Sequence, residues 1–292
     1  MIRDFAWITV AYVVAILAAG LTLPFVTDYH VLVQVLIADV IATGVVFAFS
    51  LVFRNSSFYD AYWSVAPVVI AFYFLWLTEA IDVRALMVTL VVTLWAVRLT
   101  GNWAYGWQGL RHEDWRYVNL AETTGIFWWP VSFLGIHLFP TVIVFLGCIA
   151  LYPAIVTGEN PLGVVDAFAL VLGLGAVWLE FQADRELHRF RAVREGPHEV
   201  LDTGVWSWCR HPNYLGEIGF WFSVYFFGYA ATGVHDRWMQ SGPVAMVLLF
   251  VIVSIPMIEK KLAADKPAYE AYKARSYALL PLSRLRASGA NP

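Results

Sequence analysis

The chain has 292 residues, 60% of them hydrophobic and 14% charged, with a formal net charge of −3 and a mean hydropathy of +0.64. An ordinary soluble domain carries ~25% charged residues, so this composition excludes a soluble globular protein and predicts an all-α polytopic membrane protein. The two cysteines, Cys148 and Cys209, lie far apart and fit neither a disulfide framework nor a zinc pattern. We therefore expect two free thiols and no metal site.

Eight segments are apolar and close to the ~20 residues that a helix needs to cross a bilayer. They lie near residues 5–26, 31–53, 62–78, 84–100, 127–151, 163–181, 214–232 and 243–258. The third and the eighth are short, so we predict a helical bundle of seven or eight transmembrane helices. The first imitates a signal peptide without a convincing cleavage site, and we interpret it as a retained helix. We expect residues 1–292 to form a single integral membrane domain.

The basic residues divide unevenly among the loops. With the N-terminus inside, all of the 19 Lys and Arg except Arg84 and Arg237 lie on the inner side, and an excess of Lys and Arg is typical of cytosolic loops. We therefore expect both termini to be cytosolic, in the plasma or inner membrane if the protein is bacterial. The long polar segments 101–126, 182–213 and 259–292 would share that side, where soluble nucleotide cofactors are available.

Four polar residues share one face of the helix expected at residues 178–194. Glu180, Asp184, His188 and Arg191 follow one another at helical spacing. A carboxylate, an imidazole and a guanidinium in one stripe suit the ribose hydroxyls and phosphates of a nucleotide. The alternative is a solvated helix end with local ion pairs, because charge stripes are common at such ends.

The sequence DTGVWSWCRHPNYLGE at residues 202–217 concentrates polar groups between two apolar spans. Such groups are costly near lipid unless they bind something. Arg210 and His211 would lie at the N-terminus of the following helix, where free N–H groups favour an anion. Asn213 and Glu217 share one face of its first turn. The alternative is a capping turn with Arg210 directed to lipid headgroups.

The C-terminal segment 259–281 places Tyr269, Tyr272 and Ser276 on one helical face, among basic residues. This face either contributes to a cofactor pocket or belongs to an amphipathic helix at the membrane interface. The sequence contains no nucleotide-binding glycine-rich loop. Any nucleotide site must therefore be made from helix ends and loops.

An acidic residue lies at the mouth of the third span. Asp60 belongs to the sequence RNSSFYDAYW at residues 54–63, where a carboxyl group needs a partner or a task. It either serves as a protonated hydrogen-bond donor to a ligand or caps the N-terminus of the span.

Three further residues are polar within apolar spans. Arg98 closes the fourth span, and Asp39 and His137 lie inside two others. We expect Asp39 and His137 to form interhelical hydrogen bonds, because ionisable groups in lipid are normally paired. Asp39 also suits a ligand pocket.

Together these residues resemble a known family. The stretch from Asp184 to Arg191, the run GVWSWCRHPNYLGE and the closing pattern of Tyr269, Tyr272 and Pro281 are similar to the C-terminal half of the steroid 5-alpha-reductase family. RNSSFYDAYW and the fragments WAVRL and HEDWRY are similar to its bacterial branch of DUF1295 membrane proteins, and the resemblance covers roughly residues 50–285. Sterol C14- and C7-reductases carry a close version of RHPNYLGE, so this motif is typical of a superfamily.

The resemblance implies an NADPH-dependent oxidoreductase acting on CH–CH groups. It would reduce a double bond conjugated to a carbonyl in a membrane lipid or a lipophilic, steroid-like molecule, without a nucleic-acid partner or an obligatory protein partner. Hydride would go to the β-carbon while a tyrosine and an acid polarise the carbonyl oxygen. The cofactor-binding positions that match are Arg98, Asp184, His188, Arg191, Arg210, His211, Asn213, Tyr214, Glu217, Tyr269 and Tyr272.

The catalytic half departs from the family pattern. Where the steroid reductases have a Gln-Glu pair, this chain has Tyr59 and Asp60, which we predict to be the catalytic residues. The family tyrosine that precedes an arginine on the fourth span is Trp95 here, and an indole has no acidic O–H group. Either Tyr59 or Tyr62 takes over its role, or the reaction is different.

Two other functions stay open. Isoprenylcysteine carboxyl methyltransferases share an RHPxYxG core and a similar tail, which allows an S-adenosylmethionine-dependent membrane methyltransferase. Asp184 and Arg191 favour the reductase, because the pyrophosphate and the 2′-phosphate of NADPH need more cationic donors than S-adenosylmethionine does. The third possibility is a non-catalytic membrane or lipid-binding protein that retains the fold, which Trp95 favours.

Overall fold

The computed structural model describes residues 1–281, and these fold into helices joined by short turns, with no strand in that range. Two compact units are formed, one by Met1–Glu159 and one that begins at Asn160; the predicted single domain stays a prediction. Arg284 and Arg286, counted above among the cytosolic residues, and the last residues of the predicted region 50–285 lie outside the described residues.

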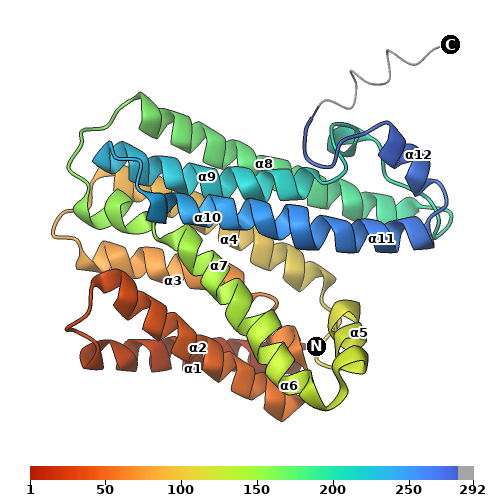
Figure 1. The fold of residues 1–292 in the computed structure, drawn as a ribbon, viewed down its shortest axis with the longest axis horizontal. Helices are drawn as coiled ribbons and strands as arrows, with labels where there is room; N and C mark the ends of the chain where they lie inside the picture. Colours follow the sequence, from red (N-terminus) through yellow and green to blue (C-terminus); the bar gives the residue numbers. More distant parts are fainter. Residues whose placement is uncertain (282–292) are drawn as a thin grey trace. The chain divides into compact units, whose positions relative to one another are not determined.

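The first unit is built from seven α-helices and several shorter turns (Figure 1). The α-helices are α1 Ile2–Thr22, α2 Val31–Phe53, α3 Tyr62–Leu77, α4 Val83–Gly106, α5 Trp115–Thr124, α6 Trp128–Val131 and α7 Phe139–Cys148. The 3₁₀ turns are η1 Leu23–Phe25, η2 Ser56–Tyr59 and η3 Gly125–Phe127, and the π-helical turns are η4 Ser132–Leu138 and η5 Pro153–Thr157.

The second unit contains five α-helices in its described part. They are α8 Val164–Val193, α9 Pro212–Thr232, α10 Arg237–Leu248, α11 Ile255–Asp265 and α12 Tyr269–Ala274. The 3₁₀ turn η6 Gly204–Ser207 precedes α9, and the π-helical turn η7 Leu249–Ser254 joins α10 to α11.

Seven helical segments within residues 1–281 are long and apolar enough to cross a membrane. They are Ile2–Phe25, Val31–Phe53, Ser56–Leu77, Val83–Gly106, Trp115–Thr157, Val164–Val193 and Arg237–Asp265. The prediction of a polytopic helical membrane protein is therefore confirmed. The segment predicted at 214–232 forms α9 but is not one of the seven, because Glu217 and several glycines and tyrosines make it less apolar than the others. The orientation of the termini stays a prediction.

Helices α8 and α9 pack closely along each other, and glycine makes this possible. A Cβ atom on Gly216 would lie 2.5 Å from Cγ of Glu180 and 3.0 Å from the carbonyl oxygen of Ala176. Both distances are below normal contact, so only glycine allows α9 to approach α8 at this point. Gly216 therefore serves the close approach of the two helices.

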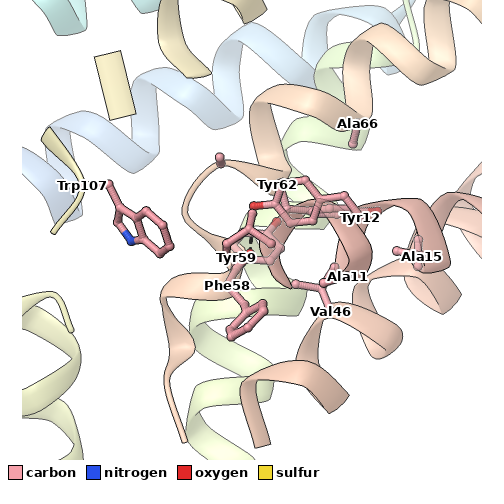
Figure 2. Close-up of a cluster of buried hydrophobic side chains, with 12 residues drawn as sticks. Ala11, Tyr12, Ala15, Val46, Phe58, Tyr59, Tyr62, Ala66 and Trp107 are labelled. Atoms are coloured by element: carbon pink, nitrogen blue, oxygen red, sulfur yellow. Dashed lines mark hydrogen bonds between the residues drawn. The ribbon is translucent and has the colours of Figure 1, made fainter. Parts of the chain in front are cut away.

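The core of the first unit lies where α1, α2 and α3 meet the turn η2. Figure 2 shows Tyr12, Tyr59 and Tyr62 side by side in this core, with Phe58 and Val46 close to them. The tyrosine hydroxyl groups need hydrogen-bond partners once they are buried. Tyr12 donates to the carbonyl oxygen of Phe58 over 2.8 Å, which links α1 to η2.

Candidate functional site

A largely apolar cavity of about 160 Å³ lies among α1, α2 and α3 in the first unit. Its wall is formed by residues between Tyr12 and Gly20 of α1, between Val35 and Ala42 of α2, and between Tyr62 and Tyr73 of α3. A cavity of ~150 Å³ with an apolar lining stays dry and can hold a molecule of the size of benzene. The cavity is therefore suited to a compact apolar group.

One carboxyl group interrupts this apolar wall. Asp39 is 6% exposed, and its Oδ1 accepts a hydrogen bond of 2.8 Å from the Tyr62 hydroxyl group. Its other oxygen, Oδ2, is buried and has no hydrogen-bond partner among residues 1–281. The bond to Tyr62 joins α2 to α3, so the predicted interhelical hydrogen bond of Asp39 is confirmed. Its predicted place beside a pocket agrees with the cavity.

The interhelical bond predicted for His137 is also confirmed. Nε2 of His137 lies 3.0 Å from Oγ of Ser50 on α2, and Nδ1 lies 3.0 Å from the carbonyl oxygen of Ser132. Both ring nitrogens are thus used inside the first unit. His137 contributes to packing between helices and does not line the cavity.

Tyr59 and Asp60 take part in other contacts of the first unit. The hydroxyl groups of Tyr59 and Thr141 are 2.7 Å apart, and Tyr59 does not line the cavity. Asp60 accepts a hydrogen bond of 2.8 Å from the hydroxyl group of Tyr117. The residue at the N-cap of α3 is Ala61, so the interpretation of Asp60 as the cap of that helix is wrong. The catalytic role of Tyr59 and Asp60 stays a prediction.

Trp95 and Arg98 both belong to α4. Trp95 is fully buried, and its ring meets that of Trp63 at 5.9 Å between centroids. Trp95 therefore packs against Trp63 of α3 within the first unit. Arg98 is half-buried in the first unit. The other predicted cofactor-binding residues belong to the second unit, so the role of Arg98 in cofactor binding stays a prediction.

The second unit contains a buried ionic cluster around Glu259. Oε1 of Glu259 accepts a hydrogen bond of 2.7 Å from Nε of Arg210 and lies 3.0 Å from Nε2 of His211. Nη1 of Arg210 also donates to the carbonyl oxygens of Lys273 and Ser276. These donors of Arg210 are therefore engaged by its own chain, in an ionic cluster that is almost fully excluded from solvent.

The residues of the same cluster also form backbone hydrogen bonds with the last described segment of the chain. The backbone N–H groups of Arg210 and His211 donate to the carbonyl oxygens of Tyr277 and Ala278, over 2.9 and 3.0 Å. Glu259 is a residue of this cluster that the sequence motifs do not predict. An acidic residue at the end of an apolar span needs a cationic partner, and this signal would have identified it.

Tyr269 and Tyr272 of α12 are buried against the turn that precedes α9. The hydroxyl group of Tyr272 donates to the carbonyl oxygens of Trp206 and Cys209. Burial raises the pKa of both tyrosines above the usual value, and the charge of Glu259 raises the pKa of Tyr269 further. Tyr269, Tyr272 and Ser276 are all buried within the protein, and their contribution to a cofactor pocket stays a prediction.

The RHPNYLGE motif forms the turn before α9 and the first turn and a half of that helix, with Pro212 as its first residue, as predicted. The ring of Tyr214 stacks on His211 and on Phe250, at 5.2 and 4.6 Å between centroids. Glu217 accepts a hydrogen bond of 2.9 Å from the indole of Trp221. By contrast, Oδ1 of Asn213 is buried and has no hydrogen-bond partner in the described part of the chain.

The polar stripe predicted at 178–194 lies on α8, which continues to Val193. Asp184 and His188 are half-buried, and Arg191 is exposed. Nζ of Lys266 lies 5.7 Å from the ring centroid of Phe190, the residue before Arg191 on α8. Burial and the charges of Arg194 and Arg191 lower the pKa of Lys266 below its usual value, although Asp265 and Glu199 oppose the shift. Such a group of cations suits phosphate.

Both cysteines are free, as predicted, and both are buried. Burial raises the pKa of the Cys209 thiol to about 11, although the N–H group of His211 and the charge of Arg210 oppose the shift. A thiol with this pKa is protonated at neutral pH, and the thiolate is the nucleophilic form. Cys209 is therefore a buried, protonated thiol beside the ionic cluster.

Fold and site define a polytopic α-helical membrane protein with an apolar cavity in one unit and a polar helix-end cluster in the other. The chain belongs to the DUF1295 family, described as "Protein of unknown function (DUF1295)", which matches residues 46–276. It is also 26% identical over 262 residues to "Uncharacterized protein C594.04c" of Schizosaccharomyces pombe. The aligned region covers 82% of this chain and 76% of that protein. No solved structure matches.

Proposed function

We propose that this protein is a membrane-embedded, NADPH-dependent reductase of a carbon–carbon double bond conjugated to a carbonyl in a lipophilic molecule. The proposal unites the resemblance to the steroid 5-alpha-reductases with two separate features of the structure. The polar end of the second unit suits a nucleotide, and the cavity of the first unit suits an apolar substrate.

The observation that carries the proposal is the unpaired amide oxygen of Asn213. A buried polar atom without a partner costs about 1–3 kcal/mol, and Oδ1 of Asn213 is such an atom within residues 1–281. A bound molecule that donates a hydrogen bond here would remove this cost. The atom lies at the first turn of α9, in the motif through which the chain resembles the NADPH-dependent reductases.

The residues present also fit the charge of NADPH. Arg191, Arg194 and Lys266 form a cationic group at the end of α8, and guanidinium groups bind phosphate oxygens through paired hydrogen bonds. Arg210 has a different task, because the bonds to Glu259 and to the C-terminal segment engage its donors. It holds that segment against the turn that precedes α9 and its Asn213. When bound, NADPH supplies the hydride.

The test is a titration of the purified protein in mild detergent with NADPH, NADH and S-adenosylmethionine by calorimetry. We expect NADPH to bind, and Asn213→Ala and Arg191→Ala each to weaken binding about tenfold, the effect of one lost hydrogen bond to a charged or buried group. Arg189→Ala is the matched control, because it removes the same charge from an exposed position of the same helix. It should bind NADPH like the unchanged protein.

Three results would contradict the proposal. Binding of S-adenosylmethionine alone would favour the methyltransferase. A folded protein that binds none of the three nucleotides would favour a lipid-binding protein without turnover. Equal losses in Arg191→Ala and Arg189→Ala would indicate a general effect of charge and no defined phosphate site.

A further inference from the structure

The cavity in the first unit has one polar point, and its chemistry restricts what can bind. We propose that this cavity binds the carbonyl-bearing end of the substrate, a compact group about the size of a single six-membered ring, and that the Asp39 carboxyl group donates a hydrogen bond to the carbonyl oxygen. The inference rests on the proposed function only in taking the bound molecule to be the substrate.

The surroundings of Asp39 determine whether its carboxyl group is charged. Asp39 lies within the span Val31–Phe53 and forms no ion pair with any residue of the described chain. A charge that is buried without a counter-ion is strongly unfavourable, so the uncharged acid is the form that this environment favours. An uncharged carboxyl group has one O–H donor and one carbonyl acceptor.

The hydrogen bond from Tyr62 determines which oxygen of the Asp39 carboxyl group carries the proton. Oδ1 of Asp39 accepts the hydrogen bond from Tyr62, so the O–H group is on Oδ2. Oδ2 is buried and has no partner within residues 1–281. The hydroxyl group of Tyr12, which also lines the cavity, is engaged by the carbonyl oxygen of Phe58. The acid thus presents a donor without an acceptor, and a carbonyl oxygen of a ligand is the missing partner.

Tyr62, the hydrogen-bond partner of Asp39, is held in place by aromatic packing. The ring of Tyr62 meets the ring of Tyr12 at 5.8 Å and that of Tyr59 at 5.5 Å between centroids, and the three side chains are labelled in Figure 2. Tyr62 is 4% exposed. A donor that is held in place by packing before the ligand arrives loses little conformational freedom on binding.

The volume of the cavity limits the size of the group that it can hold. Small side chains leave the space open: Ala19 and Gly20 on α1, Ala38 and Ala42 on α2, and Ala66 on α3. The resulting volume of about 160 Å³ is close to that of a cavity that holds one benzene ring. A four-ring steroid is several times larger than a single benzene ring. We therefore expect a slender molecule that inserts one ring-sized carbonyl end, with the remainder of its apolar body outside the cavity.

The test measures binding without NADPH, in detergent, by the change in tryptophan fluorescence. The probes are a cyclohexenone with a straight alkyl chain, the cyclohexene with the same chain, and a steroid enone. We expect the cyclohexenone to bind about tenfold more tightly than the cyclohexene, as one buried hydrogen bond predicts. The steroid enone should bind more weakly than the cyclohexenone.

Four variants connect this preference to Asp39. Asp39→Leu should abolish the preference for the carbonyl, and Asp39→Asn should restore part of it because the amide keeps a donor. Ala66→Phe should weaken both chain-bearing probes by filling the cavity. Ser50→Ala is the control, since it removes a buried polar group from the same helix at a position away from the cavity. Its binding should be unchanged, and thermal unfolding establishes that each variant is folded.

The inference is overturned if cyclohexenone and cyclohexene bind equally, if Asp39→Leu keeps the preference, or if the steroid enone binds as tightly as the cyclohexenone. Failure of the proposed function gives a different result. Tight binding of the cyclohexenone without consumption of NADPH would contradict the reductase and leave the site in place. Reduction that is unaffected by Asp39→Leu would support the reductase and contradict this site.

Discussion

The ionic cluster of the second unit and the cavity of the first unit use polar groups in opposite ways. In the cluster, Glu259 joins Arg210 and His211, and Arg210 is held further by two carbonyl oxygens of the C-terminal segment. In the cavity, a single carboxyl group, Asp39, lies in an apolar wall with one oxygen bonded and one without a partner. The region rich in polar residues therefore serves mainly as framework, and the region poor in them presents an available group.

This difference changes how the RHPNYLGE motif is interpreted. Its charged residues are largely engaged by the protein itself, and its uncharged Asn213 keeps an unpaired oxygen. A crowd of polar residues in a sequence thus indicates a structured site without showing which atoms are free for a ligand.

The largest effect on stability is expected when the centre of the ionic cluster is removed. Glu259→Ala leaves Arg210 buried without its counter-ion, and loss of one partner from a buried pair costs about 3–5 kcal/mol. We expect a large fall in the melting temperature in detergent. Glu270→Ala, an exposed change on α12, is the control and should have little effect. A melting temperature of Glu259→Ala equal to that of the control would show that the cluster is not a framework element.

A smaller effect is expected at the close approach of α9 to α8 in the same unit. Gly216→Ala would place a methyl group 2.5 Å from Glu180 and 3.0 Å from a backbone oxygen. Such overpacking costs about 1–3 kcal/mol, which thermal unfolding would detect. Gly175→Ala on α8 meets no atom within 4 Å and should be neutral or slightly stabilising. Equal behaviour of the two variants would contradict the close packing.

The smallest effect concerns Cys209, which probes the cluster without a mutation. Its thiol is fully buried and its pKa is raised to about 11, so at pH 8 about one molecule in a thousand carries the thiolate. We expect slow alkylation in the folded protein and rapid alkylation after unfolding, as measured by mass spectrometry. Glu259→Ala should accelerate the reaction in the native state. Rapid alkylation of the unchanged protein would contradict a closed cluster.

Much of the fold could be predicted from the residues alone. The apolar segments became helices, α8 extended to Val193 with its polar stripe, and Pro212 began α9. The site was less predictable. Glu259 was not recognised, and Asp60 was considered as a cap of α3 although Ala61 occupies that position. Asp39 was recognised as polar within a span, but its pairing with Tyr62 depended on how α2 meets α3.

The sequence by itself determined that this protein is a polytopic helical membrane protein, because apolar runs of this length can satisfy their backbone hydrogen bonds in lipid only as helices. The tertiary structure decided which polar groups remain available. Arg210 and Asn213 are three residues apart in one motif, yet the first is bonded by Glu259, 49 residues further along, and the second keeps an unpaired oxygen. Partners so distant in the chain are chosen by helix packing, which no local pattern of residues specifies.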